Sequence, residues 1–355
     1  MTEMWTVGVG LPGMAAKFAV AAEEGGWDGL AIVDSQNLSG DVYVALAMAA
    51  RETSKLKVAP GVTNPYTRHP AVTAGSIASV HGESGGRAVL GIGRGDSALA
   101  HIGLSPASVP FFENYVARVQ GYLKGEEVPF QDESDSGPVA VDELGLSDAP
   151  RASRLSWLNP KLPKVPMQIV ATGPKVIGVA ARHGDGMNAA VGADPERVAW
   201  ALDTARKARA DAGLDPEGIS FGAFVNVVCD PDVDAARQMI RGGLSTFARF
   251  SVMHGTPTGP VSDEQRDVLT SVHSAYDMTR HTMTGSAQSQ LLTGSFVDRF
   301  GVTGDAAHCI DRLRQLTALG LERLVIVGPS IGSDPDRARA ARDRFQAEVL
   351  PAFRD

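Results

Sequence analysis

The sequence of 355 residues lacks most features of secreted, membrane-spanning and disulfide-rich proteins. It has two cysteines, Cys229 and Cys309, which are too few and too far apart in sequence for a disulfide framework or a zinc-ligand motif. The first residues, MTEMWTVGVG, lack the charged leader and apolar core of a signal peptide. No run of about 18 apolar residues is available to span a membrane. These absences predict a protein of the reducing cytoplasm.

Positive charge is also scarce. The chain has 33 Lys and Arg residues against 41 Asp and Glu residues, which gives a formal net charge of −8. A surface for nucleic acid or an anionic membrane needs clustered Lys and Arg, so we expect neither partner. Hydrophobic residues make up 43% of the chain and charged residues 21%, which is the composition of a globular protein with a large core.

Eight apolar, strand-like runs alternate with helical stretches along the chain. The runs are predicted at residues 5–9, 29–33, 56–62, 88–92, 167–171, 186–191, 219–228 and 323–327. This alternation indicates parallel strands joined by right-handed crossovers. An open doubly wound sheet and a closed barrel both fit it, and eight units favour the α/β fold of a (β/α)8 TIM barrel. We therefore expect one barrel domain over residues 1–355.

Two stretches do not fit the repeat, at about 125–166 and 254–302. The first contains the acidic residues Asp132, Glu133 and Asp135, and the second contains MTRHTMTGSAQSQ at 278–290. Long loops in a compact domain are often lids or binding loops, so we expect both insertions around one mouth of the barrel. Surface decoration or an oligomer contact is the alternative.

Four features at strand ends are candidates for a binding site. Asp34 follows the second strand, where a carboxylate binds a ligand or caps the next helix. GVTNPYTRHPA (61–71) contains prolines and an asparagine that end the third strand sharply. This segment is interpreted either as part of a ligand site or as an ordinary strand-to-helix loop. GGRAVLGIGRGDS (85–97) runs from the fourth strand into glycines that allow close backbone approach. Its glycine spacing does not match a dinucleotide fingerprint. ATGPKV (171–176) begins a helix whose free N–H groups and Lys175 favour a phosphate, with an ordinary helix start as the alternative.

The eight histidines are scattered, without an HExxH motif or a paired metal spacing. We therefore expect no metal site. A G-x-S-x-G elbow is also missing, which leaves a serine hydrolase unsupported.

GVTNPYTRHP followed by SGGRAVLGIGRGD closely resembles the bacterial-luciferase-like superfamily. The resemblance is strongest to its deazaflavin-dependent branch, which includes methylene-tetrahydromethanopterin reductase. It is dense over residues 5–125, resumes at VPMQIVATGPKVIGVAARHGDGMNAAVG (165–192), and is weak over both insertions. It implies a barrel, commonly dimeric, that holds 5-deazaflavin coenzyme F420 or a flavin at its carboxyl-terminal mouth and acts on a small-molecule substrate.

The resemblance also implies roles for particular residues. Asp34 would lie near the reactive face of the ring, and Gly61–Val62 would form a bulge with a non-prolyl cis peptide behind it. Asn64 would bond the ring or the polyol chain. The remaining cofactor contacts would come from Arg94, Gly95, Asp96, Gly173, Pro174, Lys175, Val176 and Ile177. The candidate proton-handling groups are Asp34, Ser35, Asp96 and His101. Arg68, Arg94 and Lys175 would offset the charge of an anionic cofactor with a glutamate tail.

Two departures bear on the substrate. Ser35 stands where sugar-phosphate dehydrogenases of this family have a histidine, and VGADP with Asp194 stands where they have a lysine for the substrate phosphate. We therefore expect an F420-dependent oxidoreductase that acts on a different small molecule, through a C=N, C=C or C–OH group. An FMN-dependent monooxygenase that works with a separate reductase is the first alternative. A non-catalytic cofactor carrier is the second.

Overall fold

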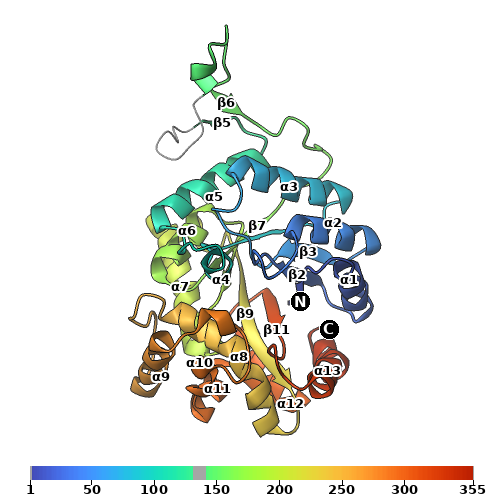
Figure 1. The fold of residues 1–355 in the computed structure, drawn as a ribbon, viewed down its shortest axis with the longest axis vertical. Helices are drawn as coiled ribbons and strands as arrows, with labels where there is room; N and C mark the ends of the chain where they lie inside the picture. Colours follow the sequence, from blue (N-terminus) through green and yellow to red (C-terminus); the bar gives the residue numbers. More distant parts are fainter. Residues whose placement is uncertain (1, 131–140, 355) are drawn as a thin grey trace.

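The computed structural model describes residues 2–130 and 141–354. Eight parallel strands form the centre of the molecule (Figure 1). They are β1 (Glu3–Val9), β2 (Gly29–Val33), β3 (Lys57–Pro60), β4 (Leu90–Ile92), β7 (Met167–Ala171), β8 (Gly186–Ala189), β9 (Ser220–Cys229) and β11 (Arg323–Val327). The sheet order is β3-β2-β1-β11-β9-β8-β7-β4. Parallel bridges Val58–Ala88 and Thr63–Ile92 join its two edges, so the sheet closes into the expected barrel.

Helices surround this barrel in the order of the chain. They are α1 (Ala15–Glu24), α2 (Val42–Glu52), α3 (Pro70–Glu83), α5 (Val109–Leu123), α6 (Pro174–His183), α7 (Pro195–Asp211), α12 (Ala306–Thr317) and α13 (Pro335–Arg344). The chain then continues through a π-helical turn at Phe345–Val349 and a 3-10 turn at Leu350–Phe353. In the described part of the chain, no helix is long and apolar enough to cross a membrane.

Local sequence explains several helix starts. Asp41 precedes α2 and accepts hydrogen bonds from the N–H groups of Tyr43 (2.9 Å) and Val44 (3.1 Å), as an aspartate at a helix N-cap does. Pro174 and Pro195 occupy the first turn of α6 and α7, where a missing N–H costs nothing. These starts fix where each strand-to-helix loop turns at the mouth of the barrel.

The first insertion lies at the opposite end from the one predicted. Residues 124–166 connect the carboxyl end of α5 to the start of β7, so they belong to the amino-terminal face of the barrel. The short pair β5 (Val128–Pro129) and β6 (Ala152–Ser153) projects beyond α3 and α5 (Figure 1). His81 at the end of α3 hydrogen-bonds the carbonyl of Pro163 over 3.0 Å. This insertion therefore does not build the mouth. Its acidic residues Asp132, Glu133 and Asp135 lie outside the described residues.

The second insertion begins earlier than predicted and covers the inside of the barrel. It comprises α8 (Val233–Ser251), α9 (Asp263–Ser274), a 3-10 turn (Met278–Arg280), α10 (Ala287–Gln290), α11 (Gly294–Phe300) and β10 (Val302–Gly304). Apolar residues of α8 and α11, such as Leu244 and Phe296, share one buried cluster with Trp5, Phe224 and Val325 from the barrel strands. The outer helices pack in a separate cluster. The segment 233–302 is thus a helical cap over the interior.

The two cysteines meet in this arrangement although 80 residues separate them. Cys229 ends β9 and Cys309 lies in α12, and both are free, buried thiols. The Cys309 thiol donates to the carbonyl of Gly304 over 3.6 Å. Burial and the neighbouring Cys229 sulfur, which is the larger cause, raise the pKa of the Cys309 thiol, so this thiol stays protonated.

Candidate active site

Asp34 is buried directly after β2, with 3% of its surface exposed. Its Oδ2 atom accepts hydrogen bonds from the Thr63 hydroxyl (2.7 Å) and from Nη1 of Arg68 (2.6 Å). Its Oδ1 atom accepts from Nε2 of Gln36 (2.8 Å). Both oxygens are therefore engaged by donors at the carboxyl ends of β2 and β3.

Arg68 connects this carboxylate to the start of α2. Its Nη2 lies 2.9 Å from Oδ2 of Asp41, and its guanidinium carbon lies 4.9 Å from the centre of the Tyr43 ring. Burial opposes the charge on Arg68, but the hydrogen bonds to Asp34 and Asp41 outweigh it and raise the arginine's pKa. Arg68 in turn lowers the pKa of Asp41, against the effect of burial. Arg68 is thus paired with two carboxylates, and its expected effect on the charge of a bound cofactor stays a prediction.

The end of β3 approaches its neighbours closely. The peptide bond between Gly61 and Val62 is cis, as the resemblance implied. A Cβ atom on Gly61 would lie 2.8 Å from that of Ala31, and one on Gly91 would lie 2.2 Å from the carbonyl oxygen of Pro60. Glycine is therefore needed at both positions for β2, β3 and β4 to pack at this distance.

Asn64 and Ser35 differ in how much of their polar surface is engaged. Asn64 is 1% exposed, and its Oδ1 accepts from the N–H groups of Tyr66 and Thr67, both at 3.1 Å. Its Nδ2 reaches Gln36 only over 3.4 Å, so this nitrogen is the atom that a cofactor contact would use. The half-buried Ser35 hydroxyl makes no hydrogen bond to any described residue.

The loop after β4 brings the next predicted residues together. Gly95 has φ +80°, and an added Cβ would lie 2.5 Å from Leu99, so both backbone and space require glycine. Arg94 donates through Nε to the carbonyl of Ala107, and burial lowers the pKa of its guanidinium. Asp96 precedes the short helix α4 (Ser97–Ala100).

His101 follows α4 and, unlike Asp34 and Asp96, has a side-chain polar atom without a hydrogen-bond partner among the described residues. Its carbonyl accepts from Nδ2 of Asn37 over 3.1 Å, which ties this loop to the loop after β2. Its ring Nε2 is buried and has no hydrogen-bond partner among the described residues. A buried polar atom without a partner costs free energy, so it marks a position that a ligand can satisfy.

Asp96 makes an ion pair that sequence reasoning missed. Its Oδ2 accepts from Nη1 of Arg249, which lies near the end of α8 in the cap. Because 153 residues separate the two, no local motif could predict this contact. The ion pair connects the cap to the loop after β4 at the rim of the barrel. It also occupies the carboxylate of Asp96, one of the candidate proton-handling groups.

Two further cap residues extend this contact. The Tyr276 ring lies 4.8 Å from the Arg249 guanidinium carbon, and its hydroxyl lies 2.8 Å from Nδ1 of His281. Burial raises the pKa of Tyr276 to about 12 and lowers that of His281 to about 4, so both are neutral near pH 7. His281 belongs to the 278–290 stretch singled out in the sequence; Tyr276 and Arg249 carried no local signal.

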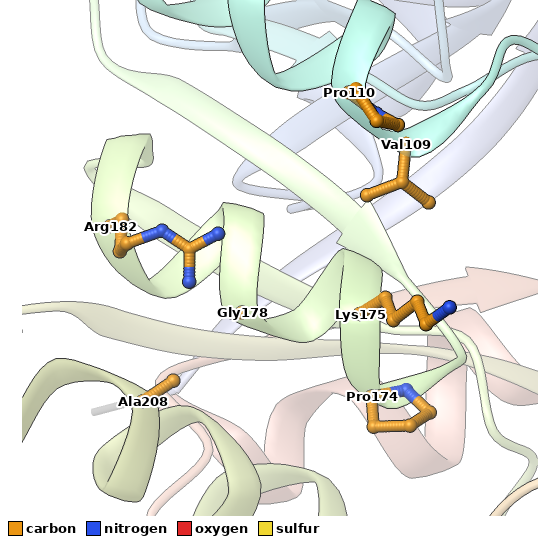
Figure 2. Close-up of a pocket in the computed structure, with 7 residues that line it drawn as sticks. All are labelled: Val109, Pro110, Pro174, Lys175, Gly178, Arg182 and Ala208. Atoms are coloured by element: carbon orange, nitrogen blue, oxygen red, sulfur yellow. The ribbon is translucent and has the colours of Figure 1, made fainter. Parts of the chain in front are cut away.

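The start of α6 is the predicted phosphate site. Gly173 has no side chain to cap the helix, and Pro174 has no N–H group. The N–H groups of Val176 (3.1 Å) and Ile177 (3.0 Å) already donate to the carbonyl of Gly173. The backbone N–H groups of Gly173 and Lys175, which no hydrogen bond among the described residues uses, and the Lys175 side chain (Figure 2) are therefore the donors that an anion would use here. Gly173, Pro174, Val176 and Ile177 shape this turn, and their expected contact with a cofactor phosphate stays a prediction.

Asp194 has a structural position. It is 1% exposed, caps α7 through the N–H of Glu196 (3.0 Å), and accepts from Gln265 (3.0 Å) and Arg299 (2.5 Å) of the cap. Burial would raise its pKa, but these hydrogen bonds lower it. Among the described residues no group of three His, Cys, Asp or Glu side chains is placed to hold a metal ion.

An eight-stranded parallel barrel with its polar groups at the carboxyl ends of the strands is the architecture of (β/α)8-barrel enzymes. The chain belongs to the luciferase-like monooxygenase family, whose sequence model matches residues 10–323. The expected family and fold are thereby confirmed.

Three known proteins illustrate the relationship. A 5,10-methylenetetrahydromethanopterin reductase from Archaeoglobus fulgidus is 31% identical over 94% of this chain and 93% of its own. An F420-dependent glucose-6-phosphate dehydrogenase from Amycolatopsis mediterranei is 29% identical over 95% and 93%. The solved coenzyme F420-dependent tetrahydromethanopterin reductase from Methanopyrus kandleri matches the fold with a TM-score of 0.73 and 20% identity, over 99% of both chains.

Proposed function

We propose that this protein is a coenzyme F420-dependent oxidoreductase that transfers a hydride between the deazaflavin and a small organic substrate. The observation that carries the proposal is the similarity, over more than nine-tenths of both chains, to relatives with different substrates. One acts on a tetrahydromethanopterin derivative and another on a sugar phosphate. The cofactor is common to the F420-dependent dehydrogenase and the F420-dependent reductase of similar fold, whereas the substrate is not.

The donor set at the mouth fits such a cofactor. His101 offers a buried ring nitrogen without a partner, and Asn64 offers an amide nitrogen with only one long contact. Lys175 offers a main-chain N–H and an ammonium group to a phosphate. Gly95 brings bare backbone to the same rim. When bound, the deazaflavin supplies two-electron hydride chemistry, so the protein needs no nucleophile of its own.

The residues of this chain then have separate tasks. Asp34 and Asp96 are each paired with a guanidinium group. These ion pairs balance the charges of the two carboxylates and hold the loops after β2 and β4 in place. His101 Nε2 and the Ser35 hydroxyl are the unengaged groups that can give or take the substrate proton. These ion pairs hold the two loops, which would position a bound cofactor against its substrate.

The substrate we propose is not a sugar phosphate. Ser35 replaces the histidine, and Asp194 occupies the stretch of the expected phosphate-binding lysine. Asp194 is moreover buried and paired with Arg299, so this position presents no free cation to a substrate phosphate. A C=N, C=C or C–OH group remains the class of reacting centre.

A parallel fluorescence titration of the purified protein with coenzyme F420 and with FMN tests the proposal. We expect the deazaflavin to bind at micromolar concentration or tighter and FMN to bind much more weakly. Substrates are then screened by loss or gain of the oxidised deazaflavin absorbance. Preferential FMN binding with reduced-flavin-dependent oxygen uptake would instead support the monooxygenase alternative. Binding without any substrate-dependent spectral change would support a cofactor carrier.

We also propose that the protein is a cytoplasmic homodimer. The support is a set of exposed apolar side chains on neighbouring helices: Phe18 of α1 (44% exposed), Val44 and Met48 of α2 (65% and 49%) and Val72 of α3 (52%). Val44 and Met48 lie four residues apart and therefore share one face of α2. Exposed apolar side chains on neighbouring helices are typical of a protein interface.

A further inference from the structure

A cavity of about 20 Å³ lies inside the barrel, and residues from all eight parallel strands line it. Much of the lining is apolar, with side chains such as Trp5, Phe224 and Val325. Gln168 of β7 and Asn188 of β8 bring amide groups into this lining. They are only 4% and 5% exposed, so bulk solvent does not satisfy their polar atoms. Buried amides of this kind normally have hydrogen-bond partners.

The neighbouring strands leave space for both amides. Gln168 pairs with Gly186 of β8, where a Cβ atom would lie 2.2 Å from Oε1 of the glutamine. Asn188 pairs with Gly222 of β9, where a Cβ atom would lie 2.1 Å from Oδ1 of the asparagine. Each amide thus occupies the position that a side chain on the next strand would need. Gly186 and Asn188 lie two residues apart on β8, so both amides are on the inward face and are diagonal neighbours.

A chain of hydrogen bonds fixes the orientation of the Gln168 amide. The Ser220 hydroxyl donates to the carbonyl of Asp185 over 3.5 Å and accepts from Nε2 of Gln168 over 3.2 Å. Because a hydroxyl has one proton to donate, the group of Gln168 that faces Ser220 is its NH2 and not its carbonyl oxygen. Oε1 of Gln168 and Oδ1 of Asn188 are buried and have no hydrogen-bond partner among the described residues. Two acceptors beside the cavity therefore lack a donor.

We propose that this cavity binds one water molecule, which donates hydrogen bonds to Oε1 of Gln168 and Oδ1 of Asn188. A buried water needs a cavity of about 10–15 Å³ and two or more polar partners, and both conditions are met here. The volume is too small for an organic ligand. Arg323 also lines the cavity, with its guanidinium carbon 5.2 Å from the centre of the Trp5 ring, so an ammonium ion would meet a like charge. The bound water connects β7 to β8 across the interior.

A crystal structure of the wild-type chain, at a resolution that shows ordered water, tests this site without any substitution. We expect one solvent peak at about 2.7–3.2 Å from both amide oxygens. Gln288 is the control in the same crystal, because its amide bonds the N–H and carbonyl of Asp277 and the carbonyl of Arg280, and no solvent peak is expected there. A cavity without density, a peak beside only one oxygen, or a direct hydrogen bond between the two amides would overturn the proposal.

Magnetic relaxation dispersion of the water signal counts long-lived internal waters in solution. Gln168→Met and Asn188→Leu each remove one acceptor, so each should lower the count by about one relative to wild type. Gln288→Met is the matched control, since it removes a fully buried amide whose partners are protein groups, and it should keep the wild-type count. An unchanged count in both cavity variants would contradict the bound water, as would an equal fall in Gln288→Met.

Discussion

The Arg68 guanidinium lies 2.6 Å from the buried carboxylate of Asp34 and holds it between β2 and β3. Arg68 comes from the loop before α3, so this one ion pair ties together the ends of two strands and a helix. The pair is almost closed to solvent, with side-chain exposures of 13% and 2%. Asp34 is therefore a candidate ligand contact, and it also stabilises the loops that form the candidate site.

Removal of Arg68 should be costly because it leaves Asp34 buried without its cation. We expect Arg68→Met to lower the free energy of unfolding by about 3–5 kcal/mol. Urea denaturation measures this loss. The double variant Asp34→Asn with Arg68→Met should recover part of it, because no buried charge is left. A loss in the single variant no larger than that of Arg51→Met, an exposed arginine on α2, would contradict the assigned burial of the pair.

Asp34→Ala should weaken cofactor binding or hydride transfer, because Thr63, Gln36 and Arg68 lose the group that orients them. Fluorescence titration separates the first effect from the second, which single-turnover absorbance measures. Glu52→Ala, at an exposed position of α2, is the control for general changes. If the Asp34→Ala protein turns over at the wild-type rate, Asp34 has no role in cofactor binding or hydride transfer.

His101→Asn should separate proton transfer from binding. Loss of a general acid or base typically lowers kcat by about 10²–10⁴-fold. Because Nε2 of His101 has no hydrogen-bond partner among the described residues, the substitution breaks no hydrogen bond at this atom, and stability should change little. Steady-state kinetics at one pH should show the decrease in kcat with little change in KM. If Ser35→Ala lowers kcat by this factor and His101→Asn does not, the serine hydroxyl is the group that transfers the proton.

Two glycines with the same backbone conformation separate strain from contact. Gly95 and Gly103 have φ of +80° and +77°, but an added Cβ meets Leu99 at 2.5 Å only at Gly95. Gly103→Ala should therefore cost about 1–2 kcal/mol from the backbone alone. Gly95→Ala should cost more and should also weaken cofactor binding. Thermal unfolding measures the stability of both variants, and titration with coenzyme F420 measures their cofactor binding. Equal losses of stability would show that the contact with Leu99 adds no cost to the backbone strain.

The sequence was sufficient for most of the barrel. The sequence predicts a helix over Ala15–Glu24, because the glycines after Glu24 stop a run of small residues, and α1 has these bounds. β11 also matched, since Arg323–Val327 is a short, continuous apolar run. The sequence pattern predicts a last helix from Pro335 to about Leu350, but in the structure the α-helix ends at Arg344 and a π turn begins at Phe345, whose ring stacks on Trp27.

The site could be predicted only where local sequence carries it. Glycines and prolines at strand ends identified the loops after β3, β4 and β7, because turns need particular backbone angles. The ion pair between Asp96 and Arg249 needed the cap to fold over the barrel, and helix α8 has no motif that indicates this. The first insertion was placed at the wrong end because it follows a helix and not a strand, a distinction that insertion length does not reveal.

The half-buried His281 predicts how stability depends on pH. Its pKa is about 4, below the ordinary value of 6.5, because burial disfavours the imidazolium; the nearby Asp96 opposes this shift, and Arg249 and His101 add to it. The unfolded chain therefore binds a proton that the folded chain does not between these values. Stability should fall by about 3 kcal/mol as pH decreases from 6.5 to 4, and it should not depend on His281 above pH 7.

Urea denaturation of wild type and of His281→Gln at pH 7 and pH 4.5 measures this contribution. The variant should lose less stability between the two pH values than wild type, by most of that amount, because it has no imidazole to protonate. His254→Gln, at an exposed histidine of the same insertion, should keep the wild-type slope. Lowered pKa values are also found for three carboxyl groups, those of Asp194, Asp41 and Glu113. Their contribution to the stability of the protein is lost only as pH falls through the acidic range in which they bind protons, and this loss is the same in wild type and in the variants. An unchanged slope in His281→Gln would therefore mean that His281 is already solvated in the folded cap.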